Sequence, residues 1–548
     1  MSASARKILV AVGWPYAQGS LHLGHVAGAY LPPDIFARYQ RAAGNDVLMV
    51  SGSDVHGTPI TVKANEEGVT PQEIVDRYHP EFLGYWDSLG IQFDLFTTTG
   101  TETHARVAQQ FFLKLLENGY LYRKMTEQYF DEQEQQFLPD RYIEGTCPHC
   151  GYDHARGDQC DNCGRTLDPI DLVAPRSKLS GSHPVLRETE HFYWKLSAFQ
   201  GPLLEWLESR KGWRPHVVNF AIGMVRDGLH DRSFTRDLDW GIPLPVDDLG
   251  PGKSIYVWWE AVMGYFSAPQ EWAERKGDPD AWKAWWEDPA AESYYFVGKD
   301  NVPFHAVYWP ALLMGHGGLN LPTDVPANQN VTFGGQKASK SRGIGRSLQW
   351  YLDRCEPDAL RYAIATSLPE TNDTDLYDDE MVRRINEELV ATWGNLVNRV
   401  VSMIHRYFDG VVPPQGELTS DDRALIDTVA DGFDDVAGHI AAVRLRAGLA
   451  TAMAVAQAAN GYLSDNEPWK TAKTNMGRTG TVLAVALDAI AGVATMIAPY
   501  LPFTSAEVLS GLGLEGSDAT WEWARVPQGT QLAALDPLFT KLESLDEE

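Results

Sequence analysis

Four cysteines within 17 residues form the clearest chemical motif in the sequence. Cys147 and Cys150 make one Cys-x-x-Cys pair, and Cys160 and Cys163 make a second. A glycine follows each pair and permits the tight turn at which backbone N–H groups face sulfur. Two such pairs can hold one tetrahedral Zn²⁺ through four thiolates, which leaves no position open for water. The motif predicts one structural zinc rather than a catalytic metal or a pair of redox dithiols.

A glycine-containing loop after the first apolar strand carries two histidines. It runs from Pro15 to His25 and ends in His22-Leu23-Gly24-His25. A helix that begins at these histidines directs N–H groups and its positive end toward phosphates, and two imidazoles one turn apart can donate hydrogen bonds to them. Gly24 leaves space for a flat base to approach the backbone. Alone, the pattern fits two ordinary histidines equally well.

A cationic loop far along the chain changes that balance. Lys337, Lys340 and Arg342 lie between Gly334-Gly335 and Gly343, together with two serines. Cations and hydroxyls on a loop bracketed by glycines suit a mobile clamp for a triphosphate. An isolated stretch of this kind would be a solvated basic turn, but its combination with the histidine motif indicates a nucleotide site that uses both.

These paired motifs resemble the two signatures of class I aminoacyl-tRNA synthetases, and nearly the whole chain resembles the methionyl-tRNA synthetase family. Besides the cysteine motif, the resemblance in the catalytic part rests on Ser53 to Pro59, Arg236 to Pro243, Gly298-Lys299-Asp300 and Phe304-His305. In the C-terminal part it rests on Asn395 to Arg399 and Pro468-Trp469.

The resemblance implies three groups of site residues. The ATP site would consist of His22, Gly24, His25, Lys337 and Lys340, all but Gly24 also acting in catalysis, with Lys340 as the main triphosphate-binding lysine. The methionine pocket would consist of Tyr16, Trp258, Tyr265 and His305, with Asp54 on the amino group. The anticodon would be read by Asn395, Arg399 and Trp469. The pocket is chemically reasonable because sulfur contacts aromatic rings favourably and an ammonium pairs with a carboxylate.

The implied activity is that of a ligase that uses ATP with Mg²⁺. The methionine carboxylate attacks the α-phosphate, pyrophosphate leaves, and the methionyl adenylate is captured by the terminal 2′-hydroxyl of methionine tRNA, initiator and elongator alike. Because the nucleophile is already ionised, activation needs alignment and charge stabilisation more than a protein base. Family members often dimerise through an appended C-terminal domain, and none follows the helical region, so a monomer is expected.

Five positions depart from the family pattern. Ala338 replaces the methionine of Lys-Met-Ser-Lys-Ser, and Ile344 replaces a frequent asparagine. Near the pocket, Glu260 and Val262 stand where many relatives have Asp and Pro, and Trp14 replaces a frequent Leu. Both histidines and both lysines are retained, so the sequence predicts an active enzyme.

Hydrophobic patterning predicts an α/β fold followed by an all-α part. Strands are expected at 8–12, 47–50, 254–258 and 294–297, and helices at 24–42, 380–407, 421–463 and 479–498. Ligands of such sheets lie beyond the carboxyl ends of the strands. The expected fold class is a Rossmann-like parallel sheet split by a zinc-knuckle insertion and followed by a helical anticodon-binding bundle. Expected boundaries are 1–126 and 216–330 for the catalytic halves, 127–215 for the insertion, 331–378 for the lysine loop and stem-contact region, and 379–548 for the bundle.

The composition sets broad limits. The 548 residues, 44% hydrophobic and 22% charged, predict several globular domains and exclude general disorder. A net charge of −28 opposes nonspecific coating of DNA or anionic lipid, although a local basic patch can bind a polyanion. The clustered cysteines and the lack of a signal-type N-terminus predict a cytosolic, that is cytoplasmic, location. The apolar stretch 482–498 contains Asp488 and predicts a buried bundle helix, so no membrane partner is expected.

Three other kinds of protein share part of this pattern. Valine, isoleucine and leucine synthetases resemble the same motifs but carry a large editing insertion, for which 127–215 is too short. A regulatory or tRNA-binding paralogue without charging activity is opposed by the retained histidines and lysines. A zinc-knuckle RNA-binding module would not need a triphosphate loop.

Overall fold

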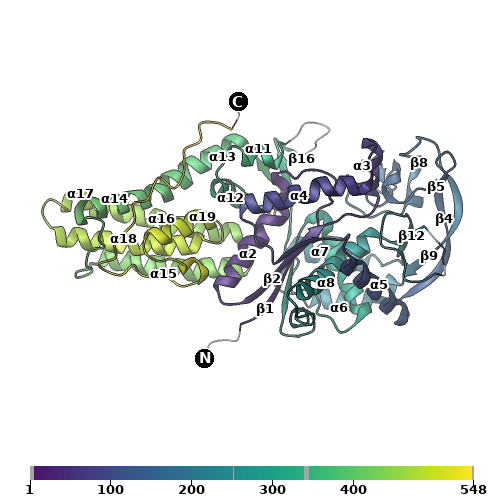
Figure 1. Ribbon diagram of the computed structural model, residues 1–548, viewed down its shortest axis with the longest axis horizontal. Helices are drawn as coiled ribbons and strands as arrows, with labels where there is room; N and C mark the ends of the chain where they lie inside the picture. Colours follow the sequence, from purple (N-terminus) through teal and green to yellow (C-terminus); the bar gives the residue numbers. More distant parts are fainter. Residues whose placement is uncertain (1–4, 248, 251, 338–344, 546–548) are drawn as a thin grey trace.

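The computed structural model describes residues 5–247, 249–250, 252–337 and 345–545. Figure 1 shows an elongated molecule, with an α/β part at one end and a helical bundle at the other. The histidine motif and the cysteine motif belong to the α/β part, and the predicted anticodon residues belong to the bundle.

Five parallel strands form the central sheet, in the order β14-β13-β1-β2-β3. Their bounds are β1 Lys7–Val12, β2 Asp46–Ser53, β3 Leu95–Thr98, β13 Glu292–Gly298 and β14 Ala327–Asn328. The apolar runs of β1 and β2 are buried, as in a sheet covered by helices on both faces. The strands predicted at 8–12, 47–50 and 294–297 are confirmed. Because β1 lies between β2 and β13, the loop after β1 opens at the crevice where ligands of such sheets bind.

The strand expected at 254–258 is wrong in part. The strand β12 covers only Lys253–Ile255 and pairs with β11 (Thr235–Asp237) outside the central sheet, and Trp258 lies on the helix α8 (Val257–Arg275). A short apolar run does not distinguish a strand from a buried helix, and α8 is buried over most of its surface. On this helix Trp258 and Tyr265 are two turns apart and share one face.

The segment between β3 and β13 contains the predicted insertion. The strands β4 (Leu121–Asp131) and β9 (Val185–Trp194) pair along most of their length. Between them lies a small sheet, β7-β6-β8, next to the cysteines. The bounds are β5 Gln136–Phe137, β6 Ile143–Thr146, β7 Ala155–Arg156, β8 Val173–Ser177 and β10 Arg232–Ser233. A further sheet, β16-β15-β17, comprises β15 Val331–Phe333, β16 Gln336–Lys337 and β17 Thr374–Leu376.

Helices cover the central sheet and bring the chain to the bundle. Those of the α/β part are α1 Leu23–His25, α2 Leu31–Ala42, α3 Thr58–Glu67, α4 Pro71–Leu89, α5 Glu102–Glu117, α6 Gln200–Glu208, α7 Pro215–Arg226, α9 Lys283–Trp286, α10 Trp309–His316, α11 Leu348–Leu352 and α12 Pro357–Ala365. A five-residue π-helix, Val26–Tyr30, joins α1 to α2, so helical structure follows the histidine motif as predicted.

The bundle is helical from Asp378 onward, and its bounds are α13 Asp378–Arg384, α14 Asn395–Phe408, α15 Ser420–Ala441, α16 Leu445–Asn466, α17 Pro468–Thr471, α18 Met476–Ile497 and α19 Pro502–Gly511. The single helix expected at 421–463 is two helices, because the chain turns at Val443, where φ is 51°. Within the described residues, α18 alone is long and apolar enough to cross a membrane, and its apolar window is completely buried in the bundle. Asp488 in this helix accepts hydrogen bonds from Val526 N–H and Gln415, both at 3.0 Å.

A buried arginine joins the two parts. Arg361 on α12 is fully buried and donates to Asp34 on α2 at 2.7 Å and to the Leu89 carbonyl at 2.9 Å. It also donates to the carbonyls of Pro499 at 2.9 Å and Tyr500 at 2.7 Å, just beyond α18. Burial alone would raise the pKa of Asp34, but the guanidinium charge beside it holds that pKa below its ordinary value. The buried charges are therefore paired and hydrogen-bonded, as their burial requires.

Candidate active site

The histidine motif forms a self-capped helix start. His22 is the N-cap of α1, and its Nδ1 accepts a hydrogen bond from the Gly24 N–H at 3.1 Å. The Nδ1 of His25 accepts from the His22 N–H at 3.2 Å, and the two ring centroids are 3.8 Å apart. Because both Nδ1 atoms are acceptors, each neutral ring carries its proton on Nε2. Both imidazoles are thus in the tautomer that can donate to a phosphate from Nε2.

The strand β15 brings the lysine motif to the histidine motif. A Cβ added at Gly24 would lie 2.9 Å from the His22 ring and 3.6 Å from Val331, so glycine is needed for this close approach. Phe333 of β15 meets the His22 ring edge-on, with ring centroids 6.1 Å apart. The strand β15 in turn pairs with β16, which contains Lys337. The strand that precedes the lysine motif therefore lies against the histidine motif, about 300 residues away in the sequence. Lys340 and the departures Ala338 and Ile344 lie outside the described residues.

The aromatic residues expected around methionine lie together. Trp258 on α8 meets Tyr16, which follows β1, edge-on with ring centroids 6.1 Å apart. Phe304 stacks on the other side of this group, with its centroid 4.1 Å from that of Trp258. The Tyr265 hydroxyl lies 2.8 Å from Nε2 of His305. The structure thus gathers side chains from three separate segments of the chain.

Hydrogen bonding fixes the tautomer of His305. Its Nδ1 lies 2.8 Å from the Asn301 carbonyl, so Nδ1 carries the proton and Nε2 accepts from the Tyr265 hydroxyl. Burial lowers the pKa of His305 to about 4, which keeps the ring neutral at physiological pH. The polar atoms of the pair are satisfied by one another, and their ring surfaces provide an environment that suits a thioether.

Two glycines make room for the indole of Trp14, the residue that replaces the family's frequent Leu. A Cβ at Gly264 of α8 would lie 2.7 Å from the Trp14 ring, and one at Gly52 of β2 would be closer still. The indole fills this space and meets Tyr265 edge-on, with centroids 6.4 Å apart. Trp14 therefore forms a wall beside the aromatic group rather than occupying a solvent-exposed position.

Asp54 lies directly after β2, next to Tyr16. Its backbone pairs with the loop after β1, since Ala17 N–H donates to the Asp54 carbonyl at 3.0 Å and Asp54 N–H donates to Pro15 at 2.8 Å. The side chain is buried, and it accepts hydrogen bonds from the His56 N–H at 3.4 Å and the Thr99 hydroxyl at 3.5 Å. Burial, followed by the charge of Glu260, raises the pKa of Asp54 well above its ordinary range.

Sequence reasoning missed a buried acid-histidine group beside Asp54. Glu260 on α8 is fully buried, lies 3.0 Å from Nδ1 of His56, and lies 3.6 Å from Nε2 of His104. Burial alone would lower the pKa of His56 and raise that of Glu260, but their mutual attraction reverses both shifts. The sequence identified Glu260 only as a departure from the family, and no spacing in it predicts contact with His104.

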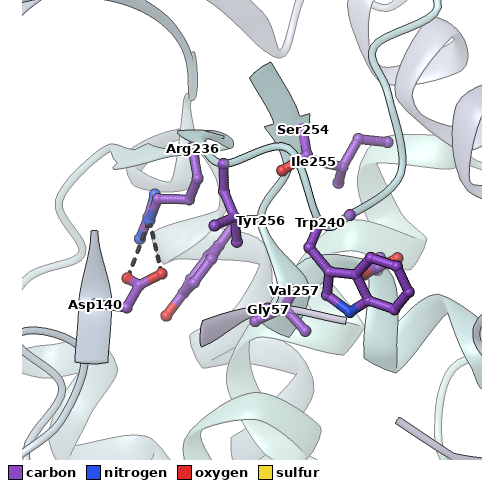
Figure 2. Close-up of a pocket in the computed structure, with 11 residues that line it drawn as sticks. Gly57, Asp140, Arg236, Trp240, Ser254, Ile255, Tyr256 and Val257 are labelled. Atoms are coloured by element: carbon purple, nitrogen blue, oxygen red, sulfur yellow. Dashed lines mark hydrogen bonds and ion pairs between the residues drawn. The ribbon is translucent and has the colours of Figure 1, made fainter. Parts of the chain in front are cut away.

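A second missed group lines the pocket in Figure 2. Arg236 of the Arg-Asp-Leu-Asp motif donates through Nε to both carboxylate oxygens of Asp140, at 3.0 and 3.3 Å. Its guanidinium lies 3.6 Å from the centroid of Tyr256, and Trp240 and Val257 line the same pocket. Burial raises the pKa of Asp140 to about 6, although Arg236 opposes the shift. Arg236 belongs to a motif that carries the family resemblance, but the resemblance implied no role for it.

The four cysteines converge as predicted. Their sulfur atoms all lie within 4.8 Å of one another, with Cys147 and Cys163 at 4.0 Å and Cys150 and Cys160 at 3.6 Å. A Zn–S bond of about 2.3 Å implies edges of about 3.8 Å in a tetrahedral site, so the donor set fits Zn²⁺. Gly151 and Gly164, which close the two knuckle turns, have φ of 74° and 71°. That conformation favours glycine.

The purified protein should contain about one Zn²⁺ per chain, and Cys147→Ser or Cys163→Ser should remove most of it. Loss of the metal should loosen the insertion, because the knuckle turns would lose the ion that joins them. Elemental analysis measures the metal, and Cys355→Ala is the matched control because Cys355 is a buried thiol outside the cluster. A fully active native protein without metal would contradict the assignment.

The helix α17, which carries Trp469, lies at the end of the bundle that is far from the central sheet (Figure 1), and the other two predicted anticodon residues are on α14. Asn395 and Arg399 are one turn apart on α14, and the Arg399 guanidinium lies 5.4 Å from the centroid of Trp469 on α17. Asn395 is exposed, and Arg399 and Trp469 are partly exposed, whereas Pro468 is buried. The indole is therefore accessible at the surface rather than part of the bundle core.

The parallel sheet, the capped histidine motif after β1 and the lysine-bearing hairpin against it define a class I aminoacyl-tRNA synthetase. A family model for class I tRNA synthetases (M) matches residues 8–401, and a model for the anticodon binding domain of methionyl tRNA ligase matches residues 412–548. The chain belongs to the methionyl-tRNA synthetase family.

The sequences of relatives align with this chain over almost its entire length. The methionine–tRNA ligase of Roseiflexus sp. (strain RS-1) is 52% identical over 520 residues, covering 93% of this chain and 88% of its own. That of Thermobifida fusca (strain YX) is 45% identical and covers 100% of this chain and 98% of its own. The Mycobacterium tuberculosis methionyl-tRNA synthetase bound by methionyl-adenylate has a TM-score of 0.82 at 25% identity, covering 98% of this chain and 100% of that one.

Proposed function

We propose that the protein is a methionine–tRNA ligase, which activates L-methionine with ATP and Mg²⁺ and transfers it to the 3′-terminal ribose of methionine tRNA. The observation that carries the proposal is the position of β15, whose Val331 and Phe333 lie against Gly24 and His22 and which pairs with the strand that contains Lys337. Tyr16 of the aromatic group follows β1 and Asp54 follows β2, at the same edge of the sheet, where a substrate can meet the nucleotide.

Methionine would bind with its thioether among Tyr16, Trp258, Tyr265 and His305, and with its ammonium at Asp54. The raised pKa of Asp54 supports this assignment, because an arriving cation replaces lost solvation and returns the carboxyl to its ionised form. The neutral state of His305 is equally suitable, since an imidazolium in this pocket would repel the ammonium and disfavour an apolar side chain.

ATP would bind with its phosphates at the Nε2–H groups of His22 and His25 and at Lys337 and Lys340. Attack of the methionine carboxylate on the α-phosphate expels pyrophosphate, and the cations and N–H donors stabilise the charge that develops. Mg²⁺ accompanies the triphosphate as its counter-ion. Asn395, Arg399 and Trp469 would then select the tRNA, initiator or elongator, by its anticodon.

The proposal also assigns the metal, the oligomeric state, the location and the domain boundaries. The four-cysteine metal would be a structural Zn²⁺, and the enzyme would act as a cytoplasmic monomer. The catalytic halves, 1–126 and 216–330, would be separated by the insertion 127–215, followed by the lysine-loop region 331–378 and the anticodon domain from 379. The start of α13 at Asp378 supports the last of these boundaries, whereas β4 begins at Leu121, before the expected start of the insertion.

Exchange of labelled pyrophosphate into ATP, measured separately with each of the twenty amino acids, tests the proposal. Methionine should support exchange far above any other amino acid, because the pocket pairs aromatic surfaces with one carboxylate. Exchange with valine, isoleucine or leucine instead would favour a related specificity. No exchange with any amino acid would favour a paralogue that binds tRNA without charging it.

A further inference from the structure

An aspartate on β17 bonds to the turn that leads into the Lys337 strand. The strand β15 is the middle of its three-stranded sheet, with β16 antiparallel on one side and β17 parallel on the other. The register places Thr332 opposite Lys337 on β16 and opposite Asp375 on β17. Asp375 and Lys337 therefore belong to one row across the sheet.

Both carboxylate oxygens of Asp375 are used inside this sheet. Oδ1 accepts from the Thr332 hydroxyl at 2.9 Å, and Oδ2 accepts from the Gly335 N–H at 2.8 Å. Gly334 and Gly335 form the two-residue turn between β15 and β16, with φ of 59° and 74° as a type I′ turn requires. Burial would raise the pKa of Asp375, but hydrogen bonds from Tyr377, Thr332 and the Gly334-Gly335 backbone lower it, so the group is ionised. The turn is thus held by a charged acceptor.

The side chains of β15 point alternately to the two faces of its sheet, and this links Asp375 to the predicted ATP site. Val331 and Phe333 meet Gly24 and His22, whereas Thr332 lies between them in sequence and bonds to Asp375. Successive side chains of a strand point to opposite faces, so one face of β15 lies against the histidine motif and the other is fastened by Asp375. The hairpin that leads into the lysine motif is therefore fixed relative to His22 by contacts on both faces of β15.

We propose that Asp375 is a positioning residue for activation, which sets the hairpin so that the lysine motif meets the triphosphate held by the histidine motif. This inference rests on the proposed function of both motifs. Asp375 touches no substrate and acts through the Gly334-Gly335 turn. Stabilisation of a transition state depends steeply on the position of the stabilising group, so a small shift of the turn should slow the chemical step.

Asp375→Asn is the sharpest variant, because it keeps the shape and removes one acceptor. The amide NH₂ can donate to the Thr332 hydroxyl, which also accepts, so the Gly335 N–H keeps an acceptor but loses the negative charge that holds the turn. We expect kcat for methionine-dependent exchange, expressed per active site by active-site titration, to fall about tenfold. KM for methionine should remain within about twofold, because the methionine pocket is built from other segments.

Asp131→Asn is the matched control. The Asp131 carboxylate likewise holds a hairpin turn, accepting from the N–H groups of Gln133 at 2.9 Å and Glu134 at 3.3 Å, but this turn follows β4 in the insertion. Its kcat should stay within about twofold of wild type, since the turn lies away from both motifs. A second measurement places Asp375→Asn on a Lys337→Ala background, where its effect should be smaller than in the wild-type chain because the two act together.

Four results would overturn the inference. They are wild-type kcat in Asp375→Asn, an equal loss of kcat in Asp131→Asn, a lower number of active sites in Asp375→Asn with unchanged kcat per site, and full additivity with Lys337→Ala. A wild-type protein without methionine-dependent exchange would instead overturn the proposed function, so the two failures are distinguishable.

Discussion

Replacing Lys340 by alanine should lower kcat for methionine-dependent ATP–pyrophosphate exchange about a hundredfold, with a much smaller change in KM for methionine. A cation that acts on charge developing in the transition state contributes roughly 3 kcal/mol, which corresponds to that factor. Methionine binds in a pocket formed by other segments, so its ground-state affinity should be little affected. Steady-state exchange at saturating ATP measures both constants.

Lys63→Ala provides the control for loss of a lysine. Lys63 pairs on the surface of α3 with Glu67 at 2.9 Å and lies outside both motifs. Exposed pairs of this kind contribute little, so exchange in this variant should match wild type. Unchanged exchange in Lys340→Ala would remove that lysine from the mechanism and leave Lys337 as the candidate cation.

Trp469→Ala should reduce charging of methionine tRNA by roughly tenfold to a hundredfold or more while methionine-dependent exchange survives. Stacking of a base on an aromatic ring is worth about 1 to 3 kcal/mol per base by alanine substitution, and unpaired anticodon bases are accessible to such stacking. The partial exposure of Trp469 beside Arg399 makes the ring available. Aminoacylation and exchange must be measured on the same preparation.

Trp393→Ala separates recognition from packing. Trp393 belongs to the same region but is fully buried, so its loss should lower the melting temperature and weaken both reactions together. If Trp469→Ala instead loses exchange and charging equally, with a lowered melting temperature, then Trp469 is a packing residue and the anticodon must be read elsewhere.

Local pattern predicted most of the architecture, and long-range contacts account for what it missed. The apolar runs of β1, β2 and β13 and the two Cys-x-x-Cys pairs are contiguous signals, so the sequence alone was sufficient to predict them. The break at Val443 depends on a left-handed backbone conformation at a residue that rarely adopts one. The Trp258 error arose because a short apolar run fits a strand and a buried helix equally well.

In the site, too, contiguous motifs were predictable from the sequence and long-range contacts were not. Family motifs indicated His22, His25 and the aromatic pocket, whereas the contact of Glu260 with His104 joins positions more than 150 residues apart without a shared motif. The bond from Asp375 to Gly335 spans 40 residues and depends on the register of β15 with both neighbours. Such pairings are set by tertiary structure, and one sequence carries no local signal of them.

The buried arginine between the two parts constrains the order in which the chain can complete its fold during synthesis. Asp34 and Leu89 leave the ribosome before Arg361, but the Pro499 and Tyr500 carbonyls follow it by 138 and 139 residues. Until they arrive, the guanidinium has only part of its acceptors, and burying it in that state would cost more than leaving it in water. The nascent α/β part therefore remains open at α12 until the end of α18 has been made, so the last helices of the bundle complete the burial of a residue in the first part of the protein.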